Sequence, residues 1–133
     1  MAVHLINPSA NSFGTSVITP RWLFVLASAT PASFGDPNLV DEYIESLEPA
    51  LIAYGDVVGI SVHTGNALRG YEVGRLAHER GATVVYGGIH ATLFPEEPFQ
   101  RGHADHVVKG DGDIAWGTLL ADLHARHGRP LDK

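Results

Sequence analysis

Residues 57–62 read Val57-Val58-Gly59-Ile60-Ser61-Val62. This run carries no charge and is mostly β-branched, which is typical of a central strand in a parallel sheet with both faces covered. The residues that follow have apolar positions at helical spacing and predict a helix over residues 67–80, with Gly81 as its stop. A strand followed by a helix indicates one βα unit.

The same alternation of strands and helices runs along the whole chain. Further strands are predicted over residues 3–6, 38–42, 83–86 and 106–109, and further helices over residues 21–29, 95–102 and 111–127. Segment 38–42 suits the start of a helix equally well. Pro95 is expected in the first turn of its helix. The alternation predicts a Rossmann-like (flavodoxin-like) three-layer α/β domain, with a parallel sheet of about five strands in the order 2-1-3-4-5.

The helices show which residues are expected to meet the sheet. Helical spacing is shared by Leu68, Tyr71, Leu76 and Ala77 in the helix over 67–80. In the last helix the side chains expected to face inward are Ile114, Leu119, Leu120 and Leu123.

Composition excludes several classes of protein. The chain has 133 residues, a formal net charge of −6 and no cysteine. A single domain is expected at this length, without disulfides, thiolate metal sites or a cysteine-held iron–sulfur cluster. The acidic balance argues against a nucleic-acid partner, and no apolar run approaches the ~20 residues of a membrane span. The N-terminus has no export signal, so a cytoplasmic location is expected.

The predicted sheet brings four loops to one edge. Ligands of such folds bind beyond the carboxyl ends of the strands, where residues 7–14, 61–66, 87–92 and 110–113 should converge. These loops are rich in small residues and poor in charge, and they contain His63 and His90. Small side chains let the backbone approach a bulky ligand closely. The pattern favours a binding edge over a hydrolytic site.

Each of these features also has a purely structural interpretation. Gly87-Gly88 suits a turn that needs positive φ, and Ser61 suits a side chain that satisfies a nearby backbone group. The segment Gly110-Asp111-Gly112-Asp113 suits a turn with a helix cap, or an anion site at a helix start. Two histidines are too few to define a zinc site, and the other six are expected in solvent.

Known nucleotide and phosphoacceptor folds can be tested by residue type. A response-regulator receiver needs acidic residues after the first and third strands, but Asn7 and residues 61–64 supply none. The Gly-x-Gly-x-x-Gly signature of a dinucleotide site is missing after the first strand. Ser9, Ser12, Thr15 and Ser16 leave a phosphate loop for FMN open.

Several segments, in order, resemble one family. They are Val58-Gly59-Ile60-Ser61, Tyr71, the run Val84-Val85-Tyr86-Gly87-Gly88-Ile89-His90-Ala91-Thr92-Leu93-Phe94-Pro95-Glu96-Glu97, and Val107-Val108-Lys109-Gly110-Asp111-Gly112-Asp113. Together they resemble the N-terminal cobalamin-binding domain of cobalamin-dependent radical S-adenosylmethionine enzymes, over nearly the whole chain.

The resemblance implies a domain that holds cobalamin over the carboxyl ends of the sheet. Ser61 would meet the nucleotide tail, and Gly87 and Gly88 would leave room for it. The full set of implied cofactor-binding residues is Asn7, Pro8, Ser61, Val62, His63, Thr64, Gly87, Gly88, Ile89, His90, Ala91, Gly110, Asp111 and Gly112.

Two departures from the family pattern limit what is implied. No Asp-x-His-x-x-Gly follows the first strand, so the lower cobalt ligand is open, with His63 or His90 as candidates. No Cys-x-x-x-Cys-x-x-Cys motif is present, so the iron–sulfur cluster and S-adenosylmethionine would be held by a radical domain, in cis or in trans. Residues 1–127 are expected to form the cobalamin domain and residues 128–133 to begin a linker.

The expected function is therefore that of a non-catalytic cofactor module. It would serve methyl transfer or a related radical reaction in the full enzyme. Two alternatives stay open at this point: a flavodoxin-like module that binds FMN or another nucleotide, and a ligand-free regulatory domain of the same fold.

Overall fold

The computed structural model describes residues 2–9, 21–109 and 113–125. Its centre is a five-stranded sheet in the order β2-β1-β3-β4-β5, and every neighbouring pair is parallel. The strands are β1 (Val3–Asn7), β2 (Asn38–Asp41), β3 (Val57–Ser61), β4 (Thr83–Gly87) and β5 (His106–Val107). The predicted fold class and strand order are confirmed.

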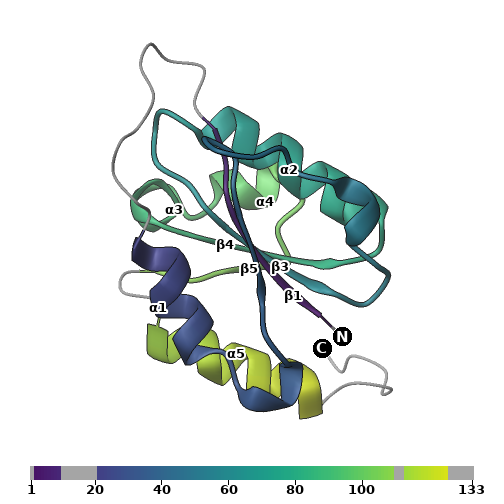
Figure 1. Cartoon of the computed structure of the whole chain (residues 1–133). Coiled ribbons are helices and arrows are strands. Elements are labelled where there is room, and N and C mark those ends of the chain that lie inside the picture. The colour runs from purple at the N-terminus through teal and green to yellow at the C-terminus, as the bar shows by residue number, and fades with distance from the viewer. Residues whose placement is uncertain (1, 10–20, 110–112, 126–133) are drawn as a thin grey trace.

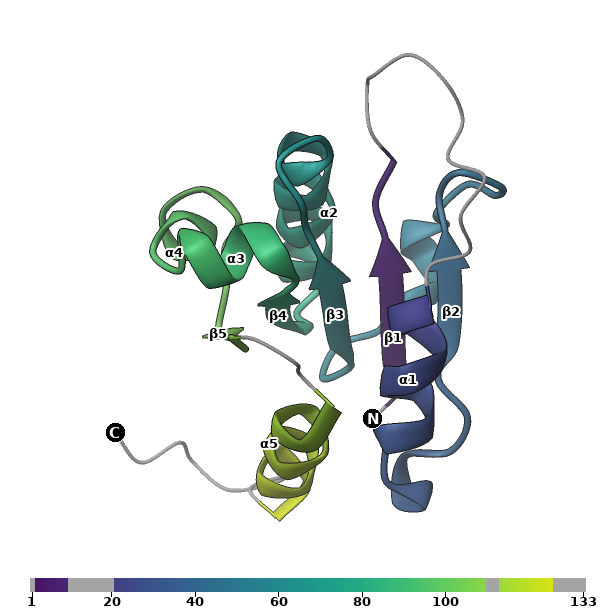
Figure 2. The ribbon, with the colours of Figure 1, turned by 90° about the vertical axis from the view of Figure 1, so that its left-hand side faces the viewer.

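Helices cover both faces of the sheet (Figures 1 and 2). α1 (Arg21–Ala29) and α5 (Asp113–Ala125) pack together on one face. α2 (Ala67–Glu79), with the short helices α3 (Ile89–Leu93) and α4 (Glu97–Arg101), lies on the other. Two 3₁₀ turns, Ala32–Phe34 and Pro49–Leu51, flank β2 along the chain. No helix in the described ranges is long and apolar enough to cross a membrane.

Side chains alternate between two cores along each strand, as a pleated strand requires. Ile60 and Tyr86 point to the α2 side, where they join Val73 of α2. Leu5 and Val85 point to the α1–α5 side. The uncharged strand runs in the sequence follow from burial on both faces.

Trp116 of α5 packs directly onto the middle of β3. A Cβ added at Gly59 would lie 2.9 Å from Cη2 of Trp116 and 3.0 Å from Cδ2 of Leu5. The indole is 2% exposed, and its Nε1–H donates to Oγ1 of Thr30 at 3.1 Å. Gly59 therefore provides the space in which the largest buried side chain sits.

Some local predictions were wrong. Residues 95–102 were predicted as one helix, but α3 already begins at Ile89 and α4 covers only Glu97–Arg101, with Pro98 rather than Pro95 in its first turn. The predicted strand over 106–109 is a two-residue strand at the sheet edge.

Two side chains at helical spacing point to solvent. Ile114 was expected to face inward but is 80% exposed, because Trp116 and Leu120 form the buried stripe of α5. Leu68 is 75% exposed at the start of α2. Apolar spacing alone does not show which apolar stripe a helix turns inward.

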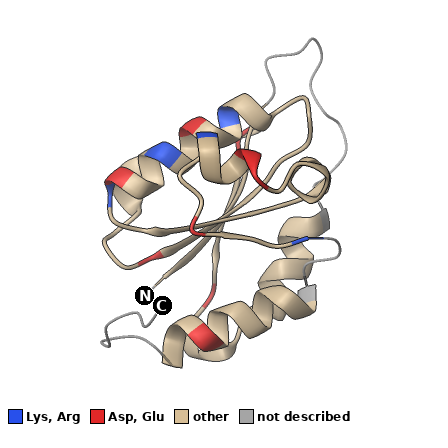
Figure 3. Ribbon diagram, turned by 180° about the vertical axis from the view of Figure 1, so that it is seen from behind, with Lys and Arg blue, Asp and Glu red and all other residues tan. Residues whose placement is uncertain are grey.

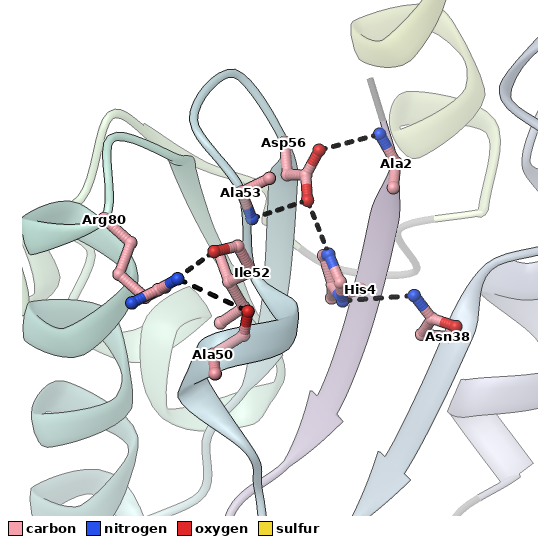
Figure 4. Close-up of polar contacts among 8 residues, drawn as sticks. All are labelled: Ala2, His4, Asn38, Ala50, Ile52, Ala53, Asp56 and Arg80. Atoms are coloured by element: carbon pink, nitrogen blue, oxygen red, sulfur yellow. Dashed lines mark hydrogen bonds and ion pairs between the residues drawn. The ribbon is translucent and has the colours of Figure 1, made fainter.

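His4 was expected in solvent, but it is buried at the amino edge of the sheet, 4% exposed, beside Asp56 (Figure 4). Nε2 of His4 and Oδ2 of Asp56 are 2.9 Å apart, and the Asn38 amide donates to Nδ1 of His4 at 3.3 Å. Asp56 also accepts backbone N–H groups of Ala2 and Ala53, both at 2.9 Å. This network joins the start of β1 to β2 and to the turn before β3.

Substituting Asp56→Asn should destabilise the chain by about 2–4 kcal/mol, because an amide NH₂ cannot accept the three buried donors that the carboxylate accepts. Urea unfolding at neutral pH measures this loss. Glu79→Gln, at a side chain that is 56% exposed, is the control and should change stability by less than about 0.5 kcal/mol. Equal stabilities of the two variants would contradict the role of Asp56.

The same carboxylate should make stability depend on acid pH. Burial alone would raise the pKa of Asp56, but the hydrogen bonds from Ala2, Ala53 and His4 outweigh it and lower the pKa below the ordinary 3.8. The stabilisation is therefore present above about pH 3.8 and is lost as the pH falls through the lower, folded-state pKa. Unfolding free energies at about pH 6 and about pH 3 should show a smaller loss in Asp56→Asn than in the wild type.

Candidate functional site

The ends of β1, β3 and β4 place three residues on one face of the sheet. Leu5 and Val85 belong to the α1–α5 core, so Asn7 and Gly87, two residues further along, lie on the same face. Ser61 pairs with Gly87 in register and shares this face. We call Asn7, Ser61 and Gly87 the strand-end row.

Trp116 lies one step below the strand-end row, against Gly59. Above it the side chains become small. A Cβ added at Gly87 would have one described atom within 4 Å, the carbonyl oxygen of Val108 at 3.7 Å. No described residue hydrogen-bonds the half-buried Ser61 hydroxyl. The α1–α5 core therefore ends at Trp116, and Ser61 and Gly87 leave a hydroxyl and uncrowded backbone above it.

Gly88 is required by the backbone itself. Its φ is 93°, and an added Cβ would lie 2.7 Å from both Ser61 Oγ and the Val62 carbonyl oxygen. Val62 N–H donates to the Gly87 carbonyl at 3.0 Å, and His90 N–H donates to the Val62 carbonyl at 3.1 Å. The loop after β3 and the start of α3 are thus held together through Gly88, as the turn interpretation of Gly87-Gly88 predicts.

A chain of side-chain hydrogen bonds runs inward from this edge. Thr64 Oγ1 and His90 Nδ1 are 3.2 Å apart, and His90 Nε2 is 2.8 Å from Glu97 Oε1. The Tyr71 hydroxyl donates to the same Glu97 oxygen at 2.7 Å. Both ring nitrogens of His90 are therefore engaged, and its side chain is 9% exposed.

These contacts shift two ionisable groups. Hydrogen bonds from His90 and then Tyr71 lower the pKa of Glu97, so it is a carboxylate at neutral pH. Burial, and then the Glu97 carboxylate, raise the pKa of Tyr71 well above its ordinary range, so its hydroxyl keeps its proton. Glu97 consequently has no proton to donate and accepts from both neighbours.

Two asparagine side chains fix the loops after β1 and β3. The Asn66 amide donates to the Pro8 carbonyl at 3.0 Å, and its oxygen accepts His63 N–H at 2.8 Å. Asn7 donates to Asp41 at 3.1 Å. The edge is therefore held in shape by its own side chains.

Glu42 ties the loop after β2 to its neighbours. It accepts the backbone N–H of Ser9 at 3.1 Å and binds the Arg69 guanidinium through two hydrogen bonds, at 3.0 and 2.7 Å. Such a two-point contact fixes direction as well as distance.

The surface around this edge is apolar on one side and charged on the other. Figure 3 shows the charged residues gathered along α2, whereas the α1–α5 layer is almost uncharged. On the α1–α5 side, exposed apolar side chains occur in the helices that begin at the carboxyl edge: Phe24, Val25 and Ile114. The α2 side also carries exposed apolar side chains beside its charges, namely Leu68, Ile89 and Leu93. An apolar ligand or protein surface would therefore meet the fewest charges on the α1–α5 side.

The structure brings most of the predicted site residues to this edge. Asn7, Ser61 and Gly87 form the strand-end row, and Thr64 and His63 are exposed beside it. Ile89 is 66% exposed, whereas Pro8, Val62 and Ala91 are buried and form the underlying support. Gly110, Asp111 and Gly112, like residues 128–133, lie outside the described residues.

The two histidines differ in their freedom to bind a metal. His90 uses both nitrogens within the chain, while His63 accepts Gly65 N–H on Nδ1 at 3.0 Å and is otherwise exposed. Across the described ranges, no group of three or more His, Asp or Glu side chains is arranged to hold a metal ion.

The site residues predicted from the sequence did not include Glu97, Tyr71, Asn66, Glu42 or Arg69. Glu97 and Tyr71 stand within the segments that carry the family resemblance, so that resemblance was the available signal. Glu42 and Arg69 are 27 residues apart, and no local pattern links them.

Comparison with known proteins finds two related methyltransferases. The chain is 41% identical over 104 residues to bacteriochlorophyllide d C-8(2)-methyltransferase of Chlorobaculum tepidum, and 27% identical over 99 residues to the C-12(1)-methyltransferase of the same organism. These matches cover 76% and 74% of this chain but only 22% and 21% of the relatives. The chain thus corresponds to about a fifth of each. No protein-family model matches it.

A solved structure shares the fold. It is the radical S-adenosylmethionine methyltransferase TsrM of Kitasatospora setae, with cobalamin and a [4Fe-4S] cluster bound. The TM-score is 0.73 at 20% identity, over 98% of this chain and 27% of that one. The chain is homologous to one part of the cobalamin-dependent radical S-adenosylmethionine methyltransferases. The resemblance seen in the sequence is therefore confirmed as homology.

The two adjacent glycines should respond oppositely to substitution. Gly88→Ala should cost about 2 kcal/mol or more, because it combines a positive φ with a Cβ pressed against Ser61 and the Val62 backbone. Gly87→Ala has room and an ordinary φ, so it should change stability by less than about 0.5 kcal/mol. Thermal and urea unfolding of the two variants would test this, and similar losses would contradict the described turn.

Proposed function

We propose that this chain holds cobalamin at the carboxyl edge of its sheet, with the nucleotide tail entering beside the strand-end row. The observation that carries the proposal is the change above Trp116, from a packed core to a Ser61 hydroxyl and a face of Gly87 that no side chain among the described residues covers. Homology to cobalamin-dependent methyltransferases supports this choice of ligand.

The residues present fit such a group. A corrin with its tail is large, so it needs backbone that it can approach closely and a few fixed polar contacts. Gly87 offers the close approach, and Ser61 offers a hydroxyl that can donate or accept. Asn7 is committed to Asp41, so we assign it a supporting role beside the tail.

The loops after β3 and β4 would meet the corrin itself. Thr64 and His63 are exposed at this edge, as is Ile89. His90 is less suited to bind cobalt than His63, because its two nitrogens already contact Thr64 and Glu97. Gly110, Asp111 and Gly112 remain assigned to the same pocket by resemblance.

The role of this chain would be to bind and orient. Bound cobalamin supplies the cobalt-centred chemistry of methyl transfer or a related radical reaction, and the chain supplies a preorganised edge and excludes water on the sheet side. The iron–sulfur cluster and S-adenosylmethionine would belong to a radical domain, in cis or in trans. We propose that residues 1–127 form the cofactor domain and residues 128–133 lead toward that partner.

Retention of cobalamin tests the proposal. The purified chain is mixed with hydroxocobalamin or with FMN and desalted, and the visible spectrum of the protein fraction is recorded. We expect retained corrin absorbance and no retained flavin. Flavin without corrin would favour the nucleotide-binding alternative, and neither ligand would favour a ligand-free regulatory domain.

Gly87→Leu should then weaken hydroxocobalamin binding at least about tenfold, which corresponds to about 1.4 kcal/mol, because the side chain fills the space proposed for the tail. Ala53→Leu, an exposed position at the amino edge, adds the same bulk elsewhere and should bind as the wild type does. Unchanged affinity of a folded Gly87→Leu would contradict the tail position.

A further inference from the structure

The series of hydrogen bonds that links Thr64, His90, Glu97 and Tyr71 determines which of their atoms carry protons. Glu97 is a carboxylate whose Oε1 accepts a hydrogen bond from the Tyr71 hydroxyl at 2.7 Å and lies 2.8 Å from His90 Nε2. Since Oε1 can only accept, Nε2 must carry the ring proton. In a neutral imidazole the other nitrogen, Nδ1, is then an acceptor.

The consequence passes outward to Thr64. Its Oγ1 lies 3.2 Å from His90 Nδ1, so against a neutral ring the threonine hydroxyl donates its single proton inward. What remains on the exposed side of Thr64 is oxygen lone pairs alone. The Ser61 hydroxyl can still donate to a ligand, because no described residue accepts a hydrogen bond from it.

We propose that His90 is held as the neutral Nε2–H tautomer, so that Thr64 presents the ligand with a hydrogen-bond acceptor and selects an N–H donor, such as a side-chain amide of the corrin, over an anionic oxygen. The identity of this amide-bearing ligand rests on the proposed function. Glu97 is a positioning residue here, since it acts on the ligand through His90 and Thr64.

The arrangement gives a buried histidine at a binding edge a role other than metal binding. His90 contacts Thr64, Glu97 and the ring of Phe94, whose centroid is 4.9 Å away. Among the described residues, Glu97 is the titratable side chain that contacts it, and Tyr71 and Arg101 act on Glu97 in turn. Through the ring, the Glu97 carboxylate determines that the exposed Thr64 oxygen acts as an acceptor.

The tautomer can be read without any ligand. Long-range ¹H–¹⁵N NMR of the free chain distinguishes a protonated Nε2 from a protonated Nδ1, and we expect Nε2–H alone on His90 at neutral pH. A ring protonated on Nδ1, or on both nitrogens, would overturn the inference whether or not corrin binds.

Ligand selection is tested with hydroxocobalamin and its separated monocarboxylic acids, in which one side-chain amide is hydrolysed. For at least one acid, the wild type should bind about tenfold or more weakly than it binds the amide. Thr64→Val should weaken hydroxocobalamin binding about 3- to 10-fold and remove most of that preference, while Thr64→Ser, which keeps the hydroxyl, should retain both.

The outcomes separate the two claims. Hydroxocobalamin binding with equal affinity for all the acids would overturn the selection by Thr64 and leave the proposed function intact. A wild-type chain that binds no corrin would contradict the proposed function, and the NMR result would then decide the acceptor state of Thr64 by itself.

Discussion

The packing of the Trp116 indole against Gly59 is the contact on which the rest of the structure depends. The indole fills the α1–α5 core as far as the layer of Gly59, two residues before the end of β3. It fits there because Gly59 has no side chain. Because the largest buried side chain stops at that layer, the next one can be built from Asn7, Ser61 and Gly87 without disturbing the core. The packed interior ends where the binding edge begins.

The two edges of the sheet are organised for different purposes. At the amino edge, Asp56 accepts hydrogen bonds from Ala2, His4 and Ala53, and these described residues form a buried network. At the carboxyl edge the loops are tied to one another through Asn66, Glu42 and His90, but Ser61 and Thr64 keep polar atoms directed outward. Such an edge is rigid before a ligand arrives, which lowers the entropic cost of binding.

Sequence reasoning succeeded where the signal was local. The uncharged run at residues 57–62 has few alternatives to a doubly covered strand, and the alternation of strands with helices then favours a parallel sheet with the observed order. It failed where the answer depended on a distant partner. His4 pairs with Asp56 across 52 residues, and nothing in either neighbourhood marks them. Ile114 was placed inward because its apolar character was visible and the dominance of Trp116 was not.

The candidate site shows the same division. Gly87-Gly88 drew attention as a pair, but only the geometry separates Gly88, which the backbone needs, from Gly87, which the fold leaves free. Whether the Thr64 hydroxyl donates or accepts could not be predicted from the sequence, because it depends on the Glu97 carboxylate, which is two hydrogen bonds away.

The most direct test of the account is to follow the backbone amides of the ¹⁵N-labelled chain while hydroxocobalamin is added. The account predicts shifts at Ser61, Thr64 and Gly87, with Ala53 and Asp56 at the amino edge unmoved. Shifts centred on the amino edge, or on the charged face of α2, would contradict it.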